Sequence, residues 1–141
     1  MIHNICHEVC YTSRKIYQYI EKKIYSFNIT PEQFIVLKTL NKQDAISQKE
    51  LSTKLDKDQN TVKAIVDKLE RKELVKRVKN DIDRRAFYLF ITDKAKETIK
   101  IVEQYEKEAL TNMLQNIDED EIKILDNILT KIRNNIKSQN Q

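Results

Sequence analysis

The sequence predicts a mainly α-helical fold with one small β-hairpin. Apolar residues recur every three to four positions through most of the 141 residues, which is typical of amphipathic helices. Only residues 87–91 alternate with the period of two that indicates a strand, with Phe87, Leu89 and Ile91 on one side. Residues 47–92 combine two short helices, a basic strand, a polar tip and this second strand. That order describes a helix-turn-helix followed by a β-wing.

The first two expected helices precede this module. Residues 2–26 carry isoleucine and valine at three- and four-residue steps, which predicts one long helix. A second helix begins after Thr30, because Thr30 suits the N-cap, Pro31 the first helical position and Gln33 the third.

The two helices of the helix-turn-helix follow. Ser47 to Glu50 form a capping-box pattern that opens a helix over 48–55. Asp58 can cap a helix over 59–72. On that helix four apolar residues form one stripe at helical spacing, and we expect them to face the core: Val62, Ile65, Val66 and Leu69.

The hairpin and the last helices complete the order. We expect strands over 74–78 and 87–91, joined by a polar tip. Thr92 can cap a helix over about 93–115, and Asp118 a final one with Glu121 at its third position. The apolar residues of that final helix follow at alternating three- and four-residue steps, as in a coiled-coil seam.

Composition excludes several classes of function. The chain has no glycine, which argues against the glycine-rich loops that bind nucleotide phosphates, and it has only two histidines, so we expect neither an enzyme nor a cofactor. We also expect no secretory signal and no membrane span. Two cysteines without a signal peptide indicate free thiols in the cytoplasm.

The positive charge lies mainly on the winged module. Residues 47–92 contain 12 lysines and arginines against 8 acidic residues, whereas residues 93–141 contain 8 against 10. A locally basic surface attracts phosphates, which favours nucleic acid as the partner.

The outward face of the helix over 59–72 is the candidate for base contacts. In a helix-turn-helix the second helix enters the major groove of double-stranded DNA, with its first residues at the base edges. Asn and Gln suit adenine, small methyl groups suit thymine, and lysine suits guanine or phosphate. The predicted contact residues are Gln59, Asn60, Thr61, Lys63, Ala64 and Lys68.

The hairpin tip is the candidate for a minor-groove contact. Arg84 and Arg85 stand on a tip narrow enough to enter that groove, where the negative potential is enhanced. Asp83 would be repelled by DNA, so we expect it to pair with Arg85 and hold the guanidinium in one direction.

The residues from 30 to 92 resemble the MarR family of bacterial winged-helix regulators. The string DIDRRAFYLFIT matches the family's Asp-x-Arg wing signature through Asp83 and Arg85. The resemblance implies a homodimer with interlocking N- and C-terminal helices, two winged lobes on a palindromic operator, and repression relieved by a small-molecule effector or by cysteine oxidation. It divides the chain into a dimerisation helix (1–29), a DNA-binding domain (30–92) and C-terminal dimerisation helices (93–141).

The chain departs from the family at two turns. Family members usually carry glycine where Asp56 and Glu73 stand here. Both positions therefore require a non-glycine residue in the left-handed region, which costs glutamate of order 1–2 kcal/mol.

One face of the first helix carries four residues that bind metals or react with oxidants: His3, Cys6, His7 and Cys10. Three interpretations stay open, namely a structural helix interface, a redox sensor, and a metal sensor completed by a partner chain. Cysteines four residues apart on one helix are poorly placed for an internal disulfide.

A second hypothesis for the whole protein is a winged helix that binds proteins and not DNA, since a fold does not fix a function. In that hypothesis exposed Tyr88 and Phe90 form the binding surface.

Overall fold

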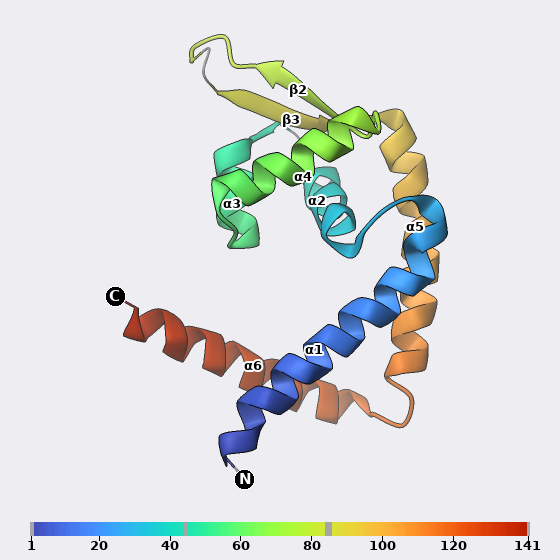
Figure 1. Cartoon of the computed structure of the whole chain (residues 1–141), viewed down its shortest axis with the longest axis vertical. Helices are drawn as coiled ribbons and strands as arrows, with labels where there is room; N and C mark the ends of the chain where they lie inside the picture. The colour runs from blue at the N-terminus through green and yellow to red at the C-terminus, as the bar shows by residue number, and fades with distance from the viewer. Residues whose placement is uncertain (1, 44, 84–85, 141) are drawn as a thin grey trace. The chain divides into compact units, whose positions relative to one another are not determined.

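The computed structural model describes residues 2–43, 45–83 and 86–140, and these form two compact units, Met1–Ala109 and Leu110–Gln141. The elements in chain order are α1 (Ile2–Ile24), the short 3-10 helix η1 (Tyr25–Phe27), α2 (Pro31–Lys42), β1 (Ile46–Ser47), α3 (Gln48–Leu55), α4 (Gln59–Arg71), β2 (Val75–Lys79), β3 (Phe87–Ile91), α5 (Asp93–Met113) and α6 (Glu119–Gln139). Each predicted helix and both predicted strands are present (Figure 1).

The helix starts are where the capping residues predict them. The Thr30 hydroxyl accepts from the Gln33 backbone N–H at 3.2 Å, and the Gln33 side chain accepts from the Thr30 N–H. Asp118 and Glu121 form the same reciprocal pair at the start of α6. These bonds satisfy N–H groups that a helix start otherwise leaves without partners, so each fixes where its helix begins.

The sheet contains one strand that the sequence did not predict. Ile46 and Ser47 form β1, which pairs antiparallel with β3 opposite Leu89 and Tyr88, and the strand order is β1-β3-β2. The predicted hairpin is therefore the outer part of a three-stranded sheet with β3 in the middle. Ile46 and Leu89 are both fully buried, so β1 attaches the sheet to the core.

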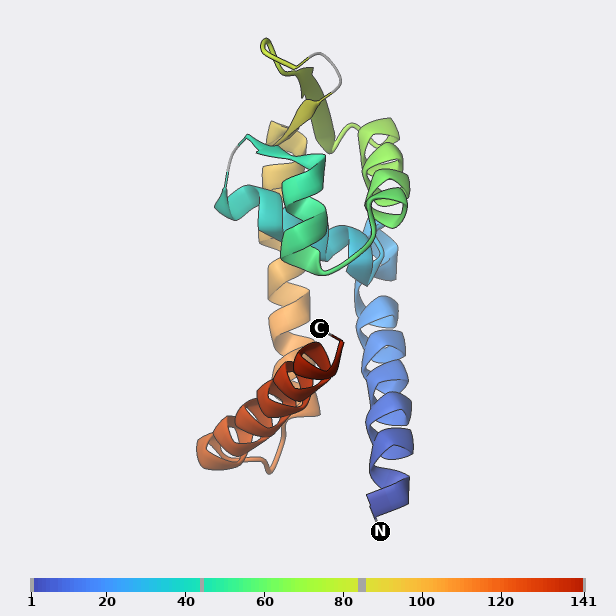
Figure 2. The same ribbon diagram turned by 90° about the vertical axis from the view of Figure 1, so that its left-hand side faces the viewer.

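The core of the first unit lies where the helix-turn-helix, the sheet and the two long helices meet. Its largest fully buried side chains come from the end of α1, from α2, α3, α4, the sheet and α5, and include Phe34, Leu37, Leu51, Leu69 and Ile99. Figure 2 shows α2, α3 and α4 gathered below the hairpin. The apolar stripe of α4 is buried as predicted, which leaves its other face to solvent.

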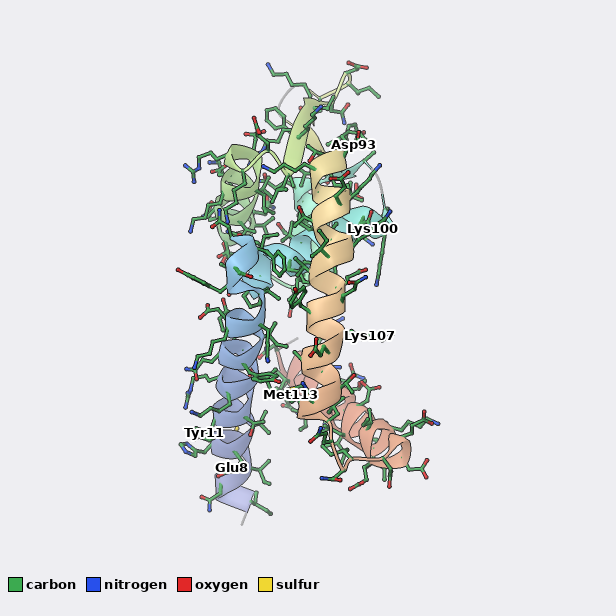
Figure 3. The ribbon with its side chains drawn as sticks, turned by 90° about the vertical axis from the view of Figure 1, so that its right-hand side faces the viewer. Glu8, Tyr11, Asp93, Lys100, Lys107 and Met113 are labelled. Carbon is green, nitrogen blue, oxygen red and sulfur yellow. The ribbon has the colours of Figure 1, made fainter. Side chains whose placement is uncertain are left out.

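The long helix α5 leaves the sheet and continues past the helix-turn-helix. Thr92 caps it, because its hydroxyl accepts from the Ala95 N–H at 3.2 Å. Figure 3 shows its course from Asp93 through Lys100 and Lys107 to Met113. An ion pair of 2.8 Å between Lys38 and Glu106 links it to α2. No helix in the described ranges is both long enough and apolar enough to cross a bilayer.

Among the residues that the structure describes, five occupy the left-handed region, and the two expected from the sequence are among them. Asp56 has φ 51° and Glu73 has φ 62°, and the others are Asn28, Ala45 and Asn116. Asn and Asp tolerate this region because their short polar side chains bond locally. Glu73 is not one of these residue types, and its φ confirms the left-handed conformation predicted for it.

We expect Glu73→Gly to raise the melting temperature by a few degrees. Relief of the left-handed conformation, of order 1–2 kcal/mol, exceeds the entropy that glycine loses on folding, about 0.5–1 kcal/mol. Differential scanning calorimetry at fixed protein concentration measures the change. Glu73→Ala is the control, because it removes the side chain and keeps the strain. An equal or lower melting temperature for the glycine variant would contradict the assignment.

Candidate nucleic-acid interface

Helix α4 has one buried face and one polar face. Val62, Val66 and Leu69 have no exposed surface, and Ile65 is 7% exposed. The six predicted contact residues on this helix are all exposed: Gln59, Asn60, Thr61, Lys63, Ala64 and Lys68. Packing of α4 against α2, α3 and β2 therefore fixes the direction in which this polar face points.

The start of α4 is held by its cap. Asp58 accepts from the Thr61 N–H and from the Thr61 hydroxyl, both at 2.8 Å. The backbone hydrogen bond from Thr61, followed by the side-chain bond, lowers the pKa of Asp58. Because the Thr61 hydroxyl donates its hydrogen to Asp58, the methyl group and the lone pairs of the hydroxyl oxygen remain for an outside contact.

The end of α4 is anchored by Lys72. Its ammonium group donates to the Asn28 carbonyl at 2.7 Å and to the Gln33 side-chain oxygen at 2.8 Å. Burial, and then the charge of Lys68, lowers the pKa of Lys72. The helix is thus tied to the junction of η1 and α2 as well as to the core.

The residue that joins α4 to the wing is Arg77 on β2, which the sequence analysis did not single out. Its guanidinium lies 2.7 Å from Asp67, 3.1 Å from Glu70 and 3.3 Å from the Gln48 amide oxygen. Asp67 also pairs with Lys63 at 3.2 Å. The charge of Lys63, which was predicted to contact guanine or phosphate, is therefore partly neutralised by its own helix.

This cluster predicts a pH dependence of stability. Hydrogen bonding from Arg77 lowers the pKa of Asp67 below its ordinary value. A carboxyl with a depressed folded pKa stabilises the fold above its unfolded pKa of about 3.9, and that contribution is lost as the pH falls through the folded value. We expect Asp67→Asn to lose less stability than the wild type between pH 5 and pH 2, by at most about 1 kcal/mol because the pair is partly exposed.

Urea midpoints across this range measure that difference. Asp81→Asn, which removes an exposed carboxyl from the hairpin tip, serves as the control and should follow the wild-type curve. If the Asp67→Asn curve runs parallel to the wild type, Asp67 does not contribute in this way.

The described part of the hairpin tip is organised by Asn80. Its side-chain oxygen accepts from the N–H groups of Ile82 at 2.9 Å and Asp83 at 3.4 Å, and its amide donates to the Tyr88 hydroxyl at 3.0 Å. Arg84 and Arg85, the predicted minor-groove residues, lie outside the described residues, and so does one half of the predicted pair between Asp83 and Arg85.

The aromatic residues expected to form a protein-binding surface on β3 are less exposed than predicted. Tyr88 and Phe90 were expected to be exposed, but both are partly buried. β3 is the middle strand of the sheet, so Tyr88 lies between Ser47 and Val78, and its hydroxyl is bonded to Asn80. Less of these two side chains is therefore available for protein binding than the alternative hypothesis expected.

The cysteines of α1 are accessible, and no metal site surrounds them in the described part of the chain. Cys6 and Cys10 are free thiols on the exposed surface, and the His7 ring stacks on Tyr11 with centroids 6.5 Å apart. Among the side chains that the structure describes, no group of three or more His, Cys, Asp or Glu residues could hold an ion. The side chain of His3 lies outside that description.

Comparisons with known proteins agree with this geometry. The family model described as MarR family matches residues 29–87. The HTH-type transcriptional regulator MgrA of Staphylococcus aureus is 27% identical over 135 residues, covering 92% of this chain and 90% of MgrA. The uncharacterized HTH-type transcriptional regulator YsmB of Bacillus subtilis is 30% identical over 111 residues, covering 79% of this chain and 76% of YsmB.

Solved structures establish the fold. A mutant MarR from Escherichia coli complexed with operator DNA superposes with a TM-score of 0.87 at 22% identity, covering 93% of this chain and 94% of that one. The Staphylococcus aureus MepR–DNA complex gives a TM-score of 0.87 at 23% identity, covering 93% of this chain and 97% of that one.

Proposed function

Because the chain belongs to the MarR family of transcriptional regulators, whose members are not enzymes, we propose that it binds a palindromic DNA operator as a homodimer and represses transcription. The observation that carries the proposal is the exposed polar face of α4, held in one direction by a fully buried opposite face. The complex of MarR with operator DNA and the MepR–DNA complex, which share the fold, support it.

We propose that α4 lies in the major groove. Gln59 and Asn60 at its start suit adenine, the methyl groups of Thr61 and Ala64 suit thymine, and Lys68 suits guanine or a phosphate. Lys63 acts while paired with Asp67, which holds its ammonium group near the helix surface.

The wing arginines are assigned to the minor groove. We expect Arg85→Ala to weaken operator binding at least tenfold and to leave the oligomeric state unchanged, because the substitution removes a charge from the wing tip only. Fluorescence anisotropy and analytical ultracentrifugation measure the two quantities. Full affinity in this variant would rule out the wing assignment.

Two unpartnered apolar faces support the homodimer. On α1, exposed side chains include Ile2, Ile5, Val9 and Ile16. On α6, they include Ile122, Leu125, Ile128, Ile132 and Ile136. Helices with such stripes normally bury them. A two-fold symmetric dimer would read half-sites about 34 Å apart, one turn of DNA.

Release of the operator is proposed to follow binding of a small effector or oxidation of Cys6 or Cys10, both of which are accessible. Mass spectrometry after mild peroxide treatment tests the thiol route. No adduct and no disulfide would exclude it. The protein is expected to act in the cytoplasm, where such thiols stay reduced.

The decisive experiment is selection of genomic DNA fragments by the full-length protein, followed by anisotropy on a selected duplex and on the same duplex scrambled. At physiological salt a specific regulator should prefer the selected duplex at least 1,000-fold. Its affinity should also fall steeply with salt concentration. Equal affinity for both duplexes would refute sequence-specific binding.

A further inference from the structure

Arg77 lies at the point where the wing meets both helices of the helix-turn-helix. It belongs to β2, while its three acceptors belong to α3 (Gln48, the first residue) and α4 (Asp67 and Glu70). Its side chain is only 15% exposed, whereas Lys76 and Val78 on either side of it in the strand are exposed. Arg77 therefore points toward the two helices.

The three contacts fix the orientation of the Arg77 guanidinium and do more than balance its charge. A guanidinium is planar and donates along fixed directions, so three acceptors around it restrict its position far more than they would restrict a lysine ammonium. Bonds between a guanidinium and a carboxylate are also about twice as strong as neutral hydrogen bonds. Since the acceptors lie on two different helices, the contacts fix β2 relative to both.

The same cluster reaches the recognition face. One oxygen of Asp67 accepts from Arg77 at 2.7 Å and the other from Lys63 at 3.2 Å. Arg77 therefore holds the carboxylate that in turn holds Lys63, a residue on the exposed face of α4. Wing position and the position of a predicted base- or phosphate-contacting side chain depend on one guanidinium.

This geometry matters because α4 and the wing are proposed to bind neighbouring grooves of one DNA duplex. A wing and a helix that engage neighbouring grooves of one duplex behave as two linked binding sites, and the advantage of linkage is lost when geometry forbids simultaneous engagement. The chain between α4 and β2 is only residues 72–74, and it includes the strained Glu73. Beyond this short connection, Arg77 adds side-chain contacts between the hairpin and both helices to the restraint that β1 pairing and buried Leu89 already provide.

We propose that Arg77 is a positioning residue for DNA recognition, which sets the wing and Lys63 relative to α4 without touching DNA itself. The proposal rests on the proposed function. It assigns to Arg77 a contribution to the preference for one sequence over another, and not to the general attraction for phosphates.

The test compares Arg77→Lys, Arg77→Met and Asp67→Asn with the wild type. Lys76→Met is the matched control, because it removes one positive charge from the adjacent, exposed position of the same strand. Anisotropy gives Kd for the selected and the scrambled duplex at several salt concentrations. All measurements are made well below the melting temperature of each variant, which circular dichroism provides.

We expect Arg77→Lys and Arg77→Met each to reduce the ratio of the affinities for the selected and the scrambled duplex at least tenfold. For Arg77→Lys, the slope of log Kd against log salt should stay within about one of the wild-type slope. Asp67→Asn should act in the same direction, and adding it to Arg77→Met should cause little further loss. Lys76→Met should change both affinities by a similar factor. Hydrogen exchange of the β2–β3 amides without DNA should be faster in Arg77→Met.

Other results would overturn the proposal. Wild-type discrimination in Arg77→Lys would show that charge alone suffices, as for a phosphate contact. A lower melting temperature with an unchanged affinity ratio in Arg77→Met would show a purely structural role, and unchanged hydrogen exchange would show that the hairpin is held without Arg77. If the wild type does not prefer the selected duplex over the scrambled one, the proposed function itself fails. If the wild type shows this preference and the Arg77 variants show it equally, only the role of Arg77 is refuted.

Discussion

Replacing Ala64 with glutamate is expected to weaken operator binding at least 100-fold while the melting temperature stays within about 2 °C of the wild type. Ala64 lies in the middle of the exposed face of α4, on the side opposite Val62 and Val66. Glutamate is a good helix former and would lie in solvent, so the fold loses little. Against DNA the same carboxylate faces phosphates, and like charges brought together cost several kcal/mol, where each 1.4 kcal/mol is tenfold in affinity.

The control for this prediction is Gln104→Glu, which adds the same charge at an exposed position of α5. It separates a local effect at the interface from the effect of a lower net charge, and should weaken binding only severalfold. Anisotropy with the selected duplex at one salt concentration measures both variants. If Ala64→Glu binds within threefold of Gln104→Glu, the polar face of α4 does not contact the operator.

The parts of the fold that local chemistry determines could be predicted from the sequence. Thr30, Ser47, Asp58 and Asp118 each satisfy a backbone N–H three residues on, so the helix starts were readable to the residue. The left-handed conformation of Glu73 was also readable, because the family places glycine there.

Features that depend on pairing between distant segments could not be read in this way. β1 has only two residues, too few to show a period, and it is a strand only because β3 lies beside it. The same pairing makes β3 a central strand, which is why Tyr88 and Phe90 are partly buried and not exposed as expected.

The residues of the candidate site could likewise be predicted only where local sequence determines them. The outward residues of α4 followed from its apolar stripe, since a helix with one buried face must expose the other. Arg77 did not follow, because its partners are 7, 10 and 29 positions away on two other elements. The only sign of this role of Arg77 is its place on β2. It lies two residues after buried Val75, and so on the same side of the strand, while the residue between them is exposed.

The second prediction with a large expected effect concerns the buried face of α4. Leu69→Ala should destabilise the folded protein by about 2–5 kcal/mol, because Leu69 is fully buried and its truncation leaves a cavity as well as lost apolar contacts. Domains of this kind have only about 5–15 kcal/mol of stability, so the variant should unfold at clearly lower urea concentration. Urea titration followed by circular dichroism measures the loss, at one protein concentration because oligomerisation contributes to stability.

Leu69→Met is the matched control, since it nearly conserves volume and should cost less than about 1.5 kcal/mol. The contrast with Ala64→Glu tests the division of α4 into two faces. Leu69→Ala protein that remains folded at low temperature should still prefer the selected duplex over the scrambled one, because no DNA-facing residue has changed. A Leu69→Ala protein as stable as the wild type would mean that α4 is not packed on the core by this face. Loss of the sequence preference in a fully folded Leu69→Ala sample would mean that the buried face also determines recognition.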